Sequence, residues 1–253
     1  MISSEIIWIT GASSGIGYEV AKQLAIQGNR VIASGRNRDA LNQLSKESDN
    51  IFPFVCDLVN DSQQGIHSSL LDLTPHLDRI VLSAGDCKYL DITSNDWSCI
   101  QQVMDINFHG TVRAIQAALP LLEKSENGHV VAVTSMASMA PFTQAEAYGA
   151  SKAALSYFLQ SLRIDLKNKN IDVTDVMPGF IDTPLTQKND FDMPFLLTTG
   201  DASKAIIKAM EKRHFNAIFP KRLFWLFKCL TFFPKIWLSL NRPKVEVDLL
   251  DVK

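Results

Sequence analysis

The chain has 253 residues, 46% of them hydrophobic, and a formal net charge of -2. This length suits one α/β domain, and the balanced charge gives no argument for nucleic-acid binding. The four cysteines are scattered without a C-x-x-C pair, which argues against a zinc site or a disulfide framework. Together with a start, MISSEIIWITG, that lacks signal-peptide features, this predicts a cytoplasmic protein with reduced thiols and no bound metal.

Short apolar runs alternate with helical patterns along the chain. Strands that are apolar throughout indicate a parallel sheet covered on both faces. We therefore predict an α/β fold: a single doubly wound (Rossmann-type) parallel sheet of about seven strands with helices on both faces, spanning 1–220. Residues 221–253 form a tail and no separate domain. The expected strands are 6–10, 30–34, 52–56, 80–83, 129–134, 172–177 and 217–219, and the expected helices are 18–27, 40–48, 97–124 and 148–169.

The first strand is followed by a glycine-rich turn, TGASSGIG at 10–17. Glycines between a strand and a helix permit a tight turn and let the backbone approach a dinucleotide pyrophosphate at the helix N-terminus. A turn rich in glycine for steric reasons alone is the alternative. The position between strand and helix favours a dinucleotide site.

The second strand ends in Ser34-Gly35-Arg36-Asn37, where an acidic residue would bind the ribose 2′-hydroxyl of NAD. A guanidinium and no carboxylate favour the 2′-phosphate of NADP(H) over NAD. The alternative is that Arg36 is an ordinary surface arginine, and Ser14 supplies no second cation for the phosphate.

Two further strand ends carry candidate cofactor contacts. Asp57 is placed to accept a hydrogen bond from the adenine amino group, with Leu58 against the ring, although Asp is also favoured as a helix cap. After the fourth strand, Ser83, Ala84 and Gly85 are small enough for the backbone to pass close to the cofactor.

The sequence from Thr134 onward contains a candidate acid/base pair. If Tyr148 opens a helix, Lys152 lies one turn further along the same face. A nearby ammonium stabilises a phenolate and lowers the pKa of the phenol, which suits general acid/base catalysis. The Tyr-x-x-x-Lys pattern is common by chance, so its meaning depends on a cofactor site elsewhere in the chain.

These features together resemble the short-chain dehydrogenase/reductase superfamily, in its compact branch with a Thr-Gly-x-x-x-Gly-x-Gly turn. The resemblance covers about residues 6–184 and adds Asn107, Ser135 and the Pro178-Gly179 segment. We expect these residues to contact the cofactor: Thr10, Gly11, Ser13, Ser14, Gly15, Ile16, Gly17, Arg36, Asp57, Leu58, Ser83, Ala84, Gly85, Tyr148, Lys152, Pro178, Gly179, Ile181 and Thr183.

The resemblance implies four catalytic residues. Tyr148 would exchange a proton with the substrate, Ser135 would hydrogen-bond the substrate oxygen, and Lys152 would lower the phenol pKa and bind the nicotinamide ribose. Asn107 would hold a water that links Lys152 to solvent, although an Asn in this apolar helix pattern can also be a packing polar group. Relatives are commonly homodimers or homotetramers built through the two long helices.

One departure from the family pattern concerns the fourth strand. Where many relatives carry Asn-Asn-Ala-Gly, this chain has Leu82-Ser83-Ala84-Gly85. The missing amides remove hydrogen bonds expected to brace this strand, which makes local rigidity uncertain.

The substrate side is expected between 183 and 201, the usual place for a mobile lid. No arginine or lysine pair converges there in the sequence, so a lipophilic ketone, aldehyde or acyl chain is the expected substrate. Core or subunit contacts are the alternative role of the apolar residues expected to line the pocket, which are Met136, Met139, Phe142, Phe180, Phe191, Met193 and Phe195.

The tail at 221–244 is basic and aromatic-rich and contains no acidic residue. Lys221, Lys228 and Lys235 recur at heptad spacing. This composition is typical of a helix that lies in a membrane interface, whereas Pro234 and the short apolar runs argue against a transmembrane helix. Packing on a neighbouring subunit or over the protein's own pocket are the alternatives.

The sequence therefore predicts an NADP(H)-dependent oxidoreductase that interconverts a lipophilic ketone or aldehyde and an alcohol, with Tyr148 as general acid/base. The alternative is a non-catalytic NADP(H)-binding regulatory or scaffold protein at a membrane surface.

Overall fold

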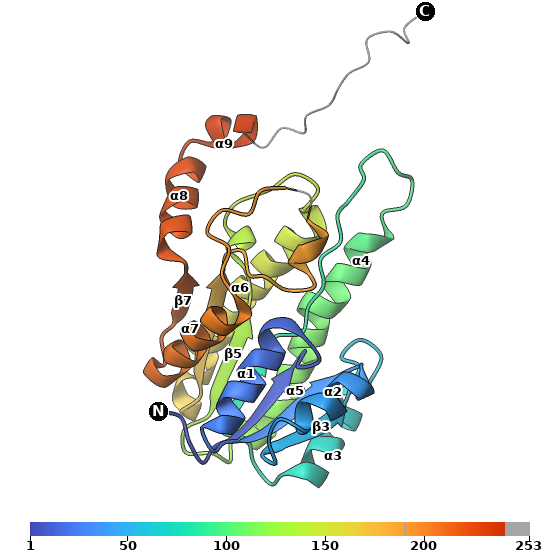
Figure 1. The fold of residues 1–253 in the computed structure, drawn as a ribbon, viewed down its shortest axis with the longest axis vertical. Helices are drawn as coiled ribbons and strands as arrows, with labels where there is room; N and C mark the ends of the chain where they lie inside the picture. Colours follow the sequence, from blue (N-terminus) through green and yellow to red (C-terminus); the bar gives the residue numbers. More distant parts are fainter. Residues whose placement is uncertain (190, 241–253) are drawn as a thin grey trace, which may run out of the picture.

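The computed structural model describes residues 1–189 and 191–240. It contains one parallel sheet in the order β3-β2-β1-β4-β5-β6-β7, flanked by helices on both faces (Figure 1), which confirms the predicted doubly wound fold. The strands are β1 (Ile6–Thr10), β2 (Arg30–Gly35), β3 (Ile51–Val55), β4 (Arg79–Leu82), β5 (His129–Val133), β6 (Asp172–Pro178) and β7 (Asn216–Phe219).

The helices differ from the sequence prediction mainly where the apolar stripe is short. The prediction missed α3 and α7, whose buried faces are interrupted by glycine, serine or lysine. The helices are α1 (Gly15–Ile26), α2 (Arg38–Ser45), α3 (Gln63–Leu73), α4 (Ser98–Met104), α5 (Thr111–Leu122), α6 (Glu146–Leu166), α7 (Thr199–Lys212), α8 (Lys221–Thr231) and α9 (Pro234–Leu240). A π-helical segment, Asp105–Gly110, joins α4 to α5.

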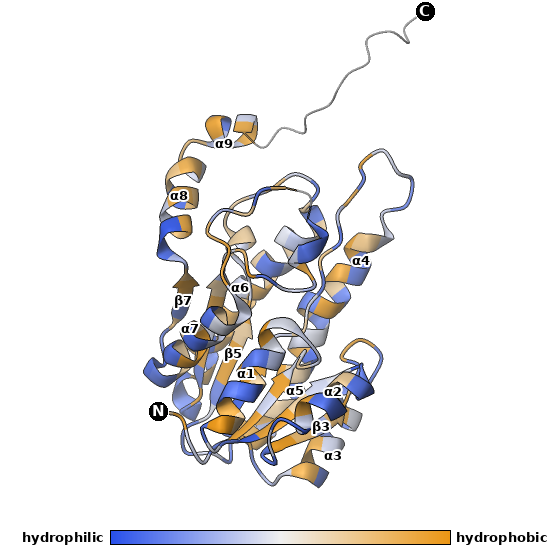
Figure 2. Cartoon of the chain, in the orientation of Figure 1, coloured by the Kyte–Doolittle hydropathy of each residue, from blue (hydrophilic) through white to orange (hydrophobic). Residues whose placement is uncertain are grey.

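The core lies in two layers, one on each side of the sheet. Alternate residues of a strand point to opposite faces, so Ile7 and Ile9 pack against α1, α2 and α7, while Trp8 packs toward α3, α5 and α6. Figure 2 shows the apolar strands between helices whose outer faces are polar. Burial on both faces explains why the strands are apolar throughout instead of alternating.

The sheet order determines where a ligand can bind. From β1 the chain proceeds outward to β2 and β3 and then returns to β4 on the other side of β1. Because all strands are parallel, the segments that follow β1, β2, β4, β5 and β6 meet at one edge of the sheet. In doubly wound sheets, such a reversal leaves a crevice at the carboxyl ends of the strands.

The tail forms two short helices, α8 and α9, that meet at 113°. In the described part of the chain no single helix is long and apolar enough to cross a membrane, and this bent pair meets the length and composition requirement only when taken together. Lys235 belongs to α9, so it does not share a helix with Lys221 and Lys228 as the heptad spacing suggested. Residues 241–244 of the predicted tail segment lie outside the described residues.

Candidate active site

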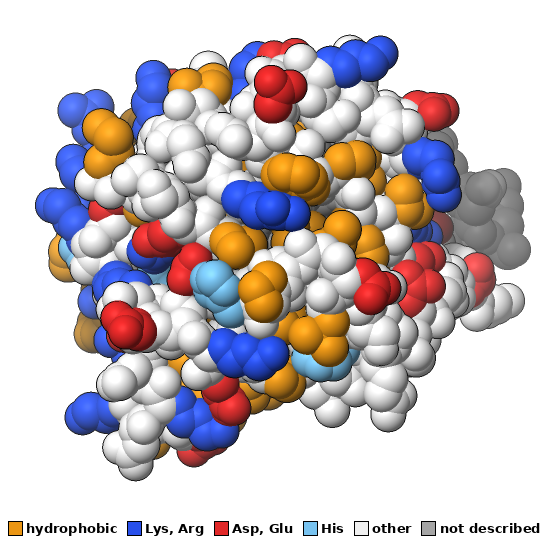
Figure 3. All heavy atoms as spheres, turned by 90° about the horizontal axis from the view of Figure 1, so that it is seen from below, with side chains coloured by type: hydrophobic (Ala, Val, Ile, Leu, Met, Phe, Trp, Pro, Cys, Tyr) orange, Lys and Arg blue, Asp and Glu red, His pale blue; other side chains and the backbone are white. Residues whose placement is uncertain are grey.

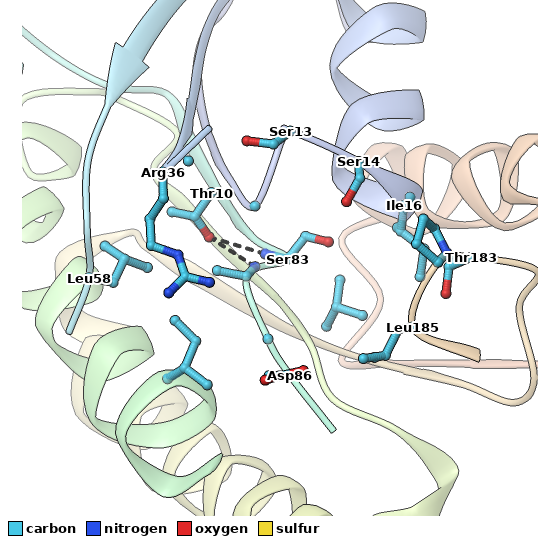
Figure 4. A pocket seen from close by; sticks show the side chains of 18 of the residues that line it. Thr10, Ser13, Ser14, Ile16, Arg36, Leu58, Ser83, Asp86, Thr183 and Leu185 are labelled. Carbon is cyan, nitrogen blue, oxygen red and sulfur yellow. Dashed lines mark hydrogen bonds between the residues drawn. The ribbon is translucent and has the colours of Figure 1, made fainter. Parts of the chain in front are cut away.

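A cleft of about 770 Å³ lies at the carboxyl ends of β1, β2, β4, β5 and β6 (Figure 4). Of the predicted site residues, Gly17, Asp57 and Asn107 do not line it. The others do: Thr10, Gly11, Ser13, Ser14, Gly15, Ile16, Arg36, Leu58, Ser83, Ala84, Gly85, Ser135, Tyr148, Lys152, Pro178, Gly179, Ile181 and Thr183.

The glycine turn is needed for close packing as well as for an open cleft. Gly11 has a φ of +67°, and a Cβ there would lie 2.6 Å from the backbone nitrogen of Ala84. A Cβ on Gly17 would lie 2.4 Å from the carbonyl oxygen of Gly11. The turn therefore brings β1, α1 and the segment after β4 together, and it leaves the first backbone N–H groups of α1 facing the cleft end of the sheet.

The segment after β4 is braced by a side chain of β1. The Thr10 hydroxyl accepts hydrogen bonds from the backbone N–H groups of Ser83 at 3.2 Å and Ala84 at 3.3 Å (Figure 4). Thr10 thus supplies bracing at the point where the family's asparagine amides are missing.

Ser13 and Arg36 form a candidate phosphate site at the far end of the cleft. The Ser13 hydroxyl oxygen is buried and has no hydrogen-bond partner among the described residues. It lies over Gly35, where a Cβ would approach it to 2.3 Å, and Figure 4 shows the Arg36 side chain extending into the cleft near Leu58. A buried unpaired hydroxyl and an exposed guanidinium that line the same cleft fit a phosphate group, so these residues suit the adenosine end of NADP(H).

Asp57 stabilises a turn after β3 and does not cap a helix, because Ser62 is the N-cap of α3. One carboxylate oxygen accepts from the Val59 N–H at 2.9 Å and the other from the Asn60 side-chain amide at 2.8 Å. Partial burial tends to raise the pKa of Asp57, but these hydrogen bonds and the nearby Arg36 charge hold it below its usual range. Because Asp57 does not line the cleft, Leu58 and its neighbours form the wall there instead.

Ser135 and Tyr148 meet at the floor of the cleft. Ser135 follows β5 with an extended backbone, and Tyr148 lies in the first turn of α6. Burial raises the pKa of Tyr148 to about 12, while a hydrogen bond with Ser135 acts in the opposite direction. The two hydroxyls are thus adjacent and both open to the cleft.

Lys152 lies beside the Tyr148 ring, and its expected effect on the pKa of the phenol stays a prediction. Its Nζ donates to the carbonyl oxygen of Val133 at 2.9 Å and lies 5.8 Å from the centroid of the Tyr148 ring. The ammonium therefore lies over the ring and against the backbone instead of at the hydroxyl. Burial has the largest effect on the pKa of Tyr148.

A buried carboxylate, Asp175 on β6, supports the placement of Ser135 and Lys152. The sequence analysis did not identify this residue. Asp175 accepts hydrogen bonds from the hydroxyls of Thr134 at 2.5 Å and Ser156 at 2.6 Å. Thr134 precedes Ser135, and Ser156 lies one turn beyond Lys152, so Asp175 ties the end of β5 to α6. An acidic residue in the middle of a predicted buried strand was the available signal.

The Asp175 charge also opposes the effect of burial on Lys152. Burial lowers the pKa of Lys152 to about 8, and the Asp175 carboxylate acts to raise it. We expect the rate of carbonyl reduction to fall above about pH 8, because deprotonation removes the ammonium that stabilises the phenolate. In Asp175→Asn this decline should begin at lower pH. A kcat profile between pH 6 and 10 tests this, and coincident profiles for the two proteins would contradict it.

Asn107 is buried in the π-helical segment and holds two parts of the site together. Its side chain accepts from the Asp86 N–H at 2.8 Å and donates to the Asp86 carbonyl and to the Ser151 hydroxyl, each at 2.9 Å. A Cβ on Gly85 would lie 3.0 Å from Asn107 Oδ1 and 3.5 Å from Lys152 Nζ. Asn107 therefore positions the segment after β4 against α6, and its link to solvent through a water stays a prediction.

The apolar residues predicted for the substrate pocket lie outside this cleft, and three of them have the core role that the sequence left open. None of the seven expected side chains lines the cleft; Met136, Phe142 and Phe180 pack instead against α8 and α9. The sequence also suggested no converging cations, yet Lys88 and Lys188 both line the cleft. These two lysines follow different strands, β4 and β6, so only the fold brings them to one site.

Comparison with known proteins decides the family. The model of the family described as short chain dehydrogenase matches residues 5–193, most of the chain. The chain belongs to the short-chain dehydrogenase/reductase family. This dehydrogenase/reductase is 32% identical over 218 residues to an uncharacterized oxidoreductase of Staphylococcus epidermidis, covering 85% of this chain and 95% of that protein. It is 34% identical to an uncharacterized oxidoreductase of Myxococcus xanthus, covering 85% and 87%.

Solved structures agree with this assignment. A short chain dehydrogenase from Shigella flexneri complexed with NADP superimposes with a TM-score of 0.77 at 28% identity, covering 86% of this chain and 96% of that chain. An Escherichia coli short chain dehydrogenase complexed with NADPH gives the same TM-score and identity, covering 86% and 95%. The cleft described here is therefore the candidate active site of an oxidoreductase.

Proposed function

We propose that this dehydrogenase/reductase uses NADP(H) to interconvert a ketone or aldehyde with an alcohol. The observation that carries the proposal is that Ser135, Tyr148 and Lys152 line the same cleft as the glycine turn. A panel of carbonyls and alcohols, assayed with NADPH and NADH, tests it. Tight cofactor binding without turnover on any member would favour the alternative of a regulatory or scaffold protein.

The chain's own residues account for the proton chemistry. When bound, NADPH would supply the hydride for the carbonyl carbon. Tyr148 donates its proton to the substrate oxygen, and Ser135 donates a hydrogen bond to the negative charge that develops there, an arrangement worth a few kcal/mol per donor. A phenol with a pKa of about 12 remains protonated at neutral pH and so is ready to act as the acid.

The preference for NADP(H) is supported by the Ser13 and Arg36 site. No carboxylate follows β2 to repel a 2′-phosphate, and the unpaired Ser13 hydroxyl lies beside Gly35. The structural neighbours from Shigella flexneri and Escherichia coli are complexes with NADP and NADPH.

Arg36→Ala is expected to weaken NADPH binding about 10- to 150-fold and to leave NADH binding unchanged, because a charge-assisted contact to phosphate contributes about 1.5–3 kcal/mol. Titration of NADPH fluorescence measures this without turnover. Arg38→Ala is the matched control, since Arg38 is also exposed but does not line the cleft. Equal NADPH affinity in the wild type and Arg36→Ala would refute the assignment.

A lipophilic substrate is supported by exposed apolar side chains in a segment that pairs, through Leu197, with the cleft residue Ile181. Phe191, Phe195 and Leu196, in the segment between β6 and α7, are each 45% exposed.

The expected homodimer or homotetramer is supported by Tyr157 and Ile164, two exposed apolar residues on the long helix α6. Light scattering measures that assembly state.

A further inference from the structure

Three aromatic or aliphatic side chains of the tail fix it to the domain. Leu223, Phe227 and Trp237 are buried, and the rings of Phe227 and Trp237 lie 5.4 and 5.3 Å from that of Phe142. The indole N–H of Trp237 also donates to the carbonyl of Pro141 at 2.6 Å. The orientation of both helices is therefore set by the domain, and this decides which of their residues face outward.

The outward face of α8 and α9 is apolar to an unusual extent. Trp225, Phe232 and Phe233 are 57%, 78% and 56% exposed. Singly exposed apolar residues are normal on protein surfaces, but a contiguous group usually marks an interaction site. The group also includes Leu226, Ile236, Leu238 and Leu240. We call these seven residues the tail surface.

The charges around the tail surface have one sign. Lys221, Arg222, Lys228 and Lys235 are exposed, and Lys221–Leu240 contains no acidic residue. The opposite end of the molecule, shown in Figure 3, mixes acidic and basic side chains around its apolar residues. Apolar side chains among cations match an interface of acyl chains and anionic headgroups, whereas a second copy would bring like charges together.

The buried sides of α8 and α9 contact segments that border the cleft. Leu223 packs so closely on the cleft residue Gly179 that a Cβ there would lie 2.5 Å away. Met136, which follows Ser135, packs in the same cluster as Phe227 and Trp237. The helices that carry the tail surface are therefore supported by the segments that hold the catalytic serine and the cleft wall.

We propose that the tail surface docks the protein on an anionic membrane, beside the opening of the cleft, so that a carbonyl lipid dissolved in the bilayer is its substrate. The lipid part of this inference rests on the proposed carbonyl chemistry, whereas docking does not. The three buried anchors keep α8 and α9 against the domain, so they lie in the interface and do not cross the bilayer.

Vesicle flotation of the full chain tests the docking. The wild type should float with phosphatidylglycerol-containing vesicles and much less with pure phosphatidylcholine. Replacing Trp225, Phe232 and Phe233 together by Ser should reduce partitioning at least about tenfold. The double change Lys228→Glu and Lys235→Glu should reduce it similarly, as should about 0.5 M salt, where the Debye length is about 4 Å.

The control variant is Ile26→Ser, because Ile26 is 68% exposed and lies at the far end of α1. It should float like the wild type. The proposal would be overturned if the wild-type protein did not float with the vesicles, or if it floated equally with neutral vesicles. So would self-association that light scattering finds only with the intact tail surface, because it would identify a second copy as the occupant.

Activity separates the two proposals. The Ser triple variant should reduce a water-soluble aldehyde at the wild-type rate but a bilayer-dissolved long-chain aldehyde at least about tenfold more slowly. Equal rates on the bilayer substrate would overturn its delivery from the membrane. Flotation without reduction of any carbonyl would instead leave docking intact and remove the proposed function.

Discussion

Tyr148→Phe is expected to lower kcat for carbonyl reduction about 1,000-fold while leaving the affinity for NADPH within about twofold. The substitution removes the only hydroxyl placed to donate the proton in this scheme, but it keeps the ring that α6 holds over Lys152. Because the lost interaction forms with the reacting oxygen, kcat should fall far more than the Kd of the cofactor rises. Steady-state kinetics and fluorescence titration measure the two quantities.

The matched control is Tyr157→Phe on the same helix. Tyr157 is 75% exposed and lies away from the cleft, so losing its hydroxyl should not alter kcat. A Tyr148→Phe protein that retains a tenth or more of the wild-type kcat would refute the role of Tyr148 as acid.

Gly17→Ala is expected to lower the free energy of unfolding by about 2–3 kcal/mol and to weaken NADPH binding about 100-fold. The new Cβ would lie 2.4 Å from the Gly11 carbonyl oxygen, and a backbone atom in a packed turn cannot move away as a flexible side chain can. Either α1 or the turn must shift, and both carry groups that line the cleft. Chemical denaturation and fluorescence titration give the two values.

Gly200→Ala provides the comparison for this change. Gly200 lies in the first turn of α7, where a Cβ would have only an ordinary contact at 3.7 Å with the Thr198 side chain. Alanine is a better helix former than glycine, so stability should stay the same or rise by up to about 1 kcal/mol. If Gly17→Ala behaved like Gly200→Ala, close packing would not explain the glycine turn.

The sequence predicted the strands well because their signal is local. A buried parallel strand needs apolar residues on both faces, and β1, β5 and β6 show this within five to seven residues. Helix α3 was missed for a related reason, since only Ile66 and Leu70 in it are buried. Its other two apolar residues, Leu71 and Leu73, are exposed or only partly buried, so the buried stripe is short.

The site residues show the same difference between local sequence signals and contacts that only the fold creates. Thr10, Ser135 and Tyr148 stand in short motifs whose spacing is fixed by one turn or one helix, so their placement at the cleft could be expected. Lys88 and Lys188 stand in no motif and come together only where two separate strands end. Asp57 accepts local hydrogen bonds from Val59 and Asn60 in a turn, and its contact with adenine stays a prediction.

By itself the sequence determined the family and the sheet and predicted the proposed roles of Ser135, Tyr148 and Lys152, since each depends on residues close together in the chain. Only the tertiary structure decided that Asp175 lies behind Lys152 and that Phe142 anchors the tail instead of lining the cleft. Those contacts join residues far apart in sequence. Burial and partner choice are properties of the packed fold, which no local pattern records.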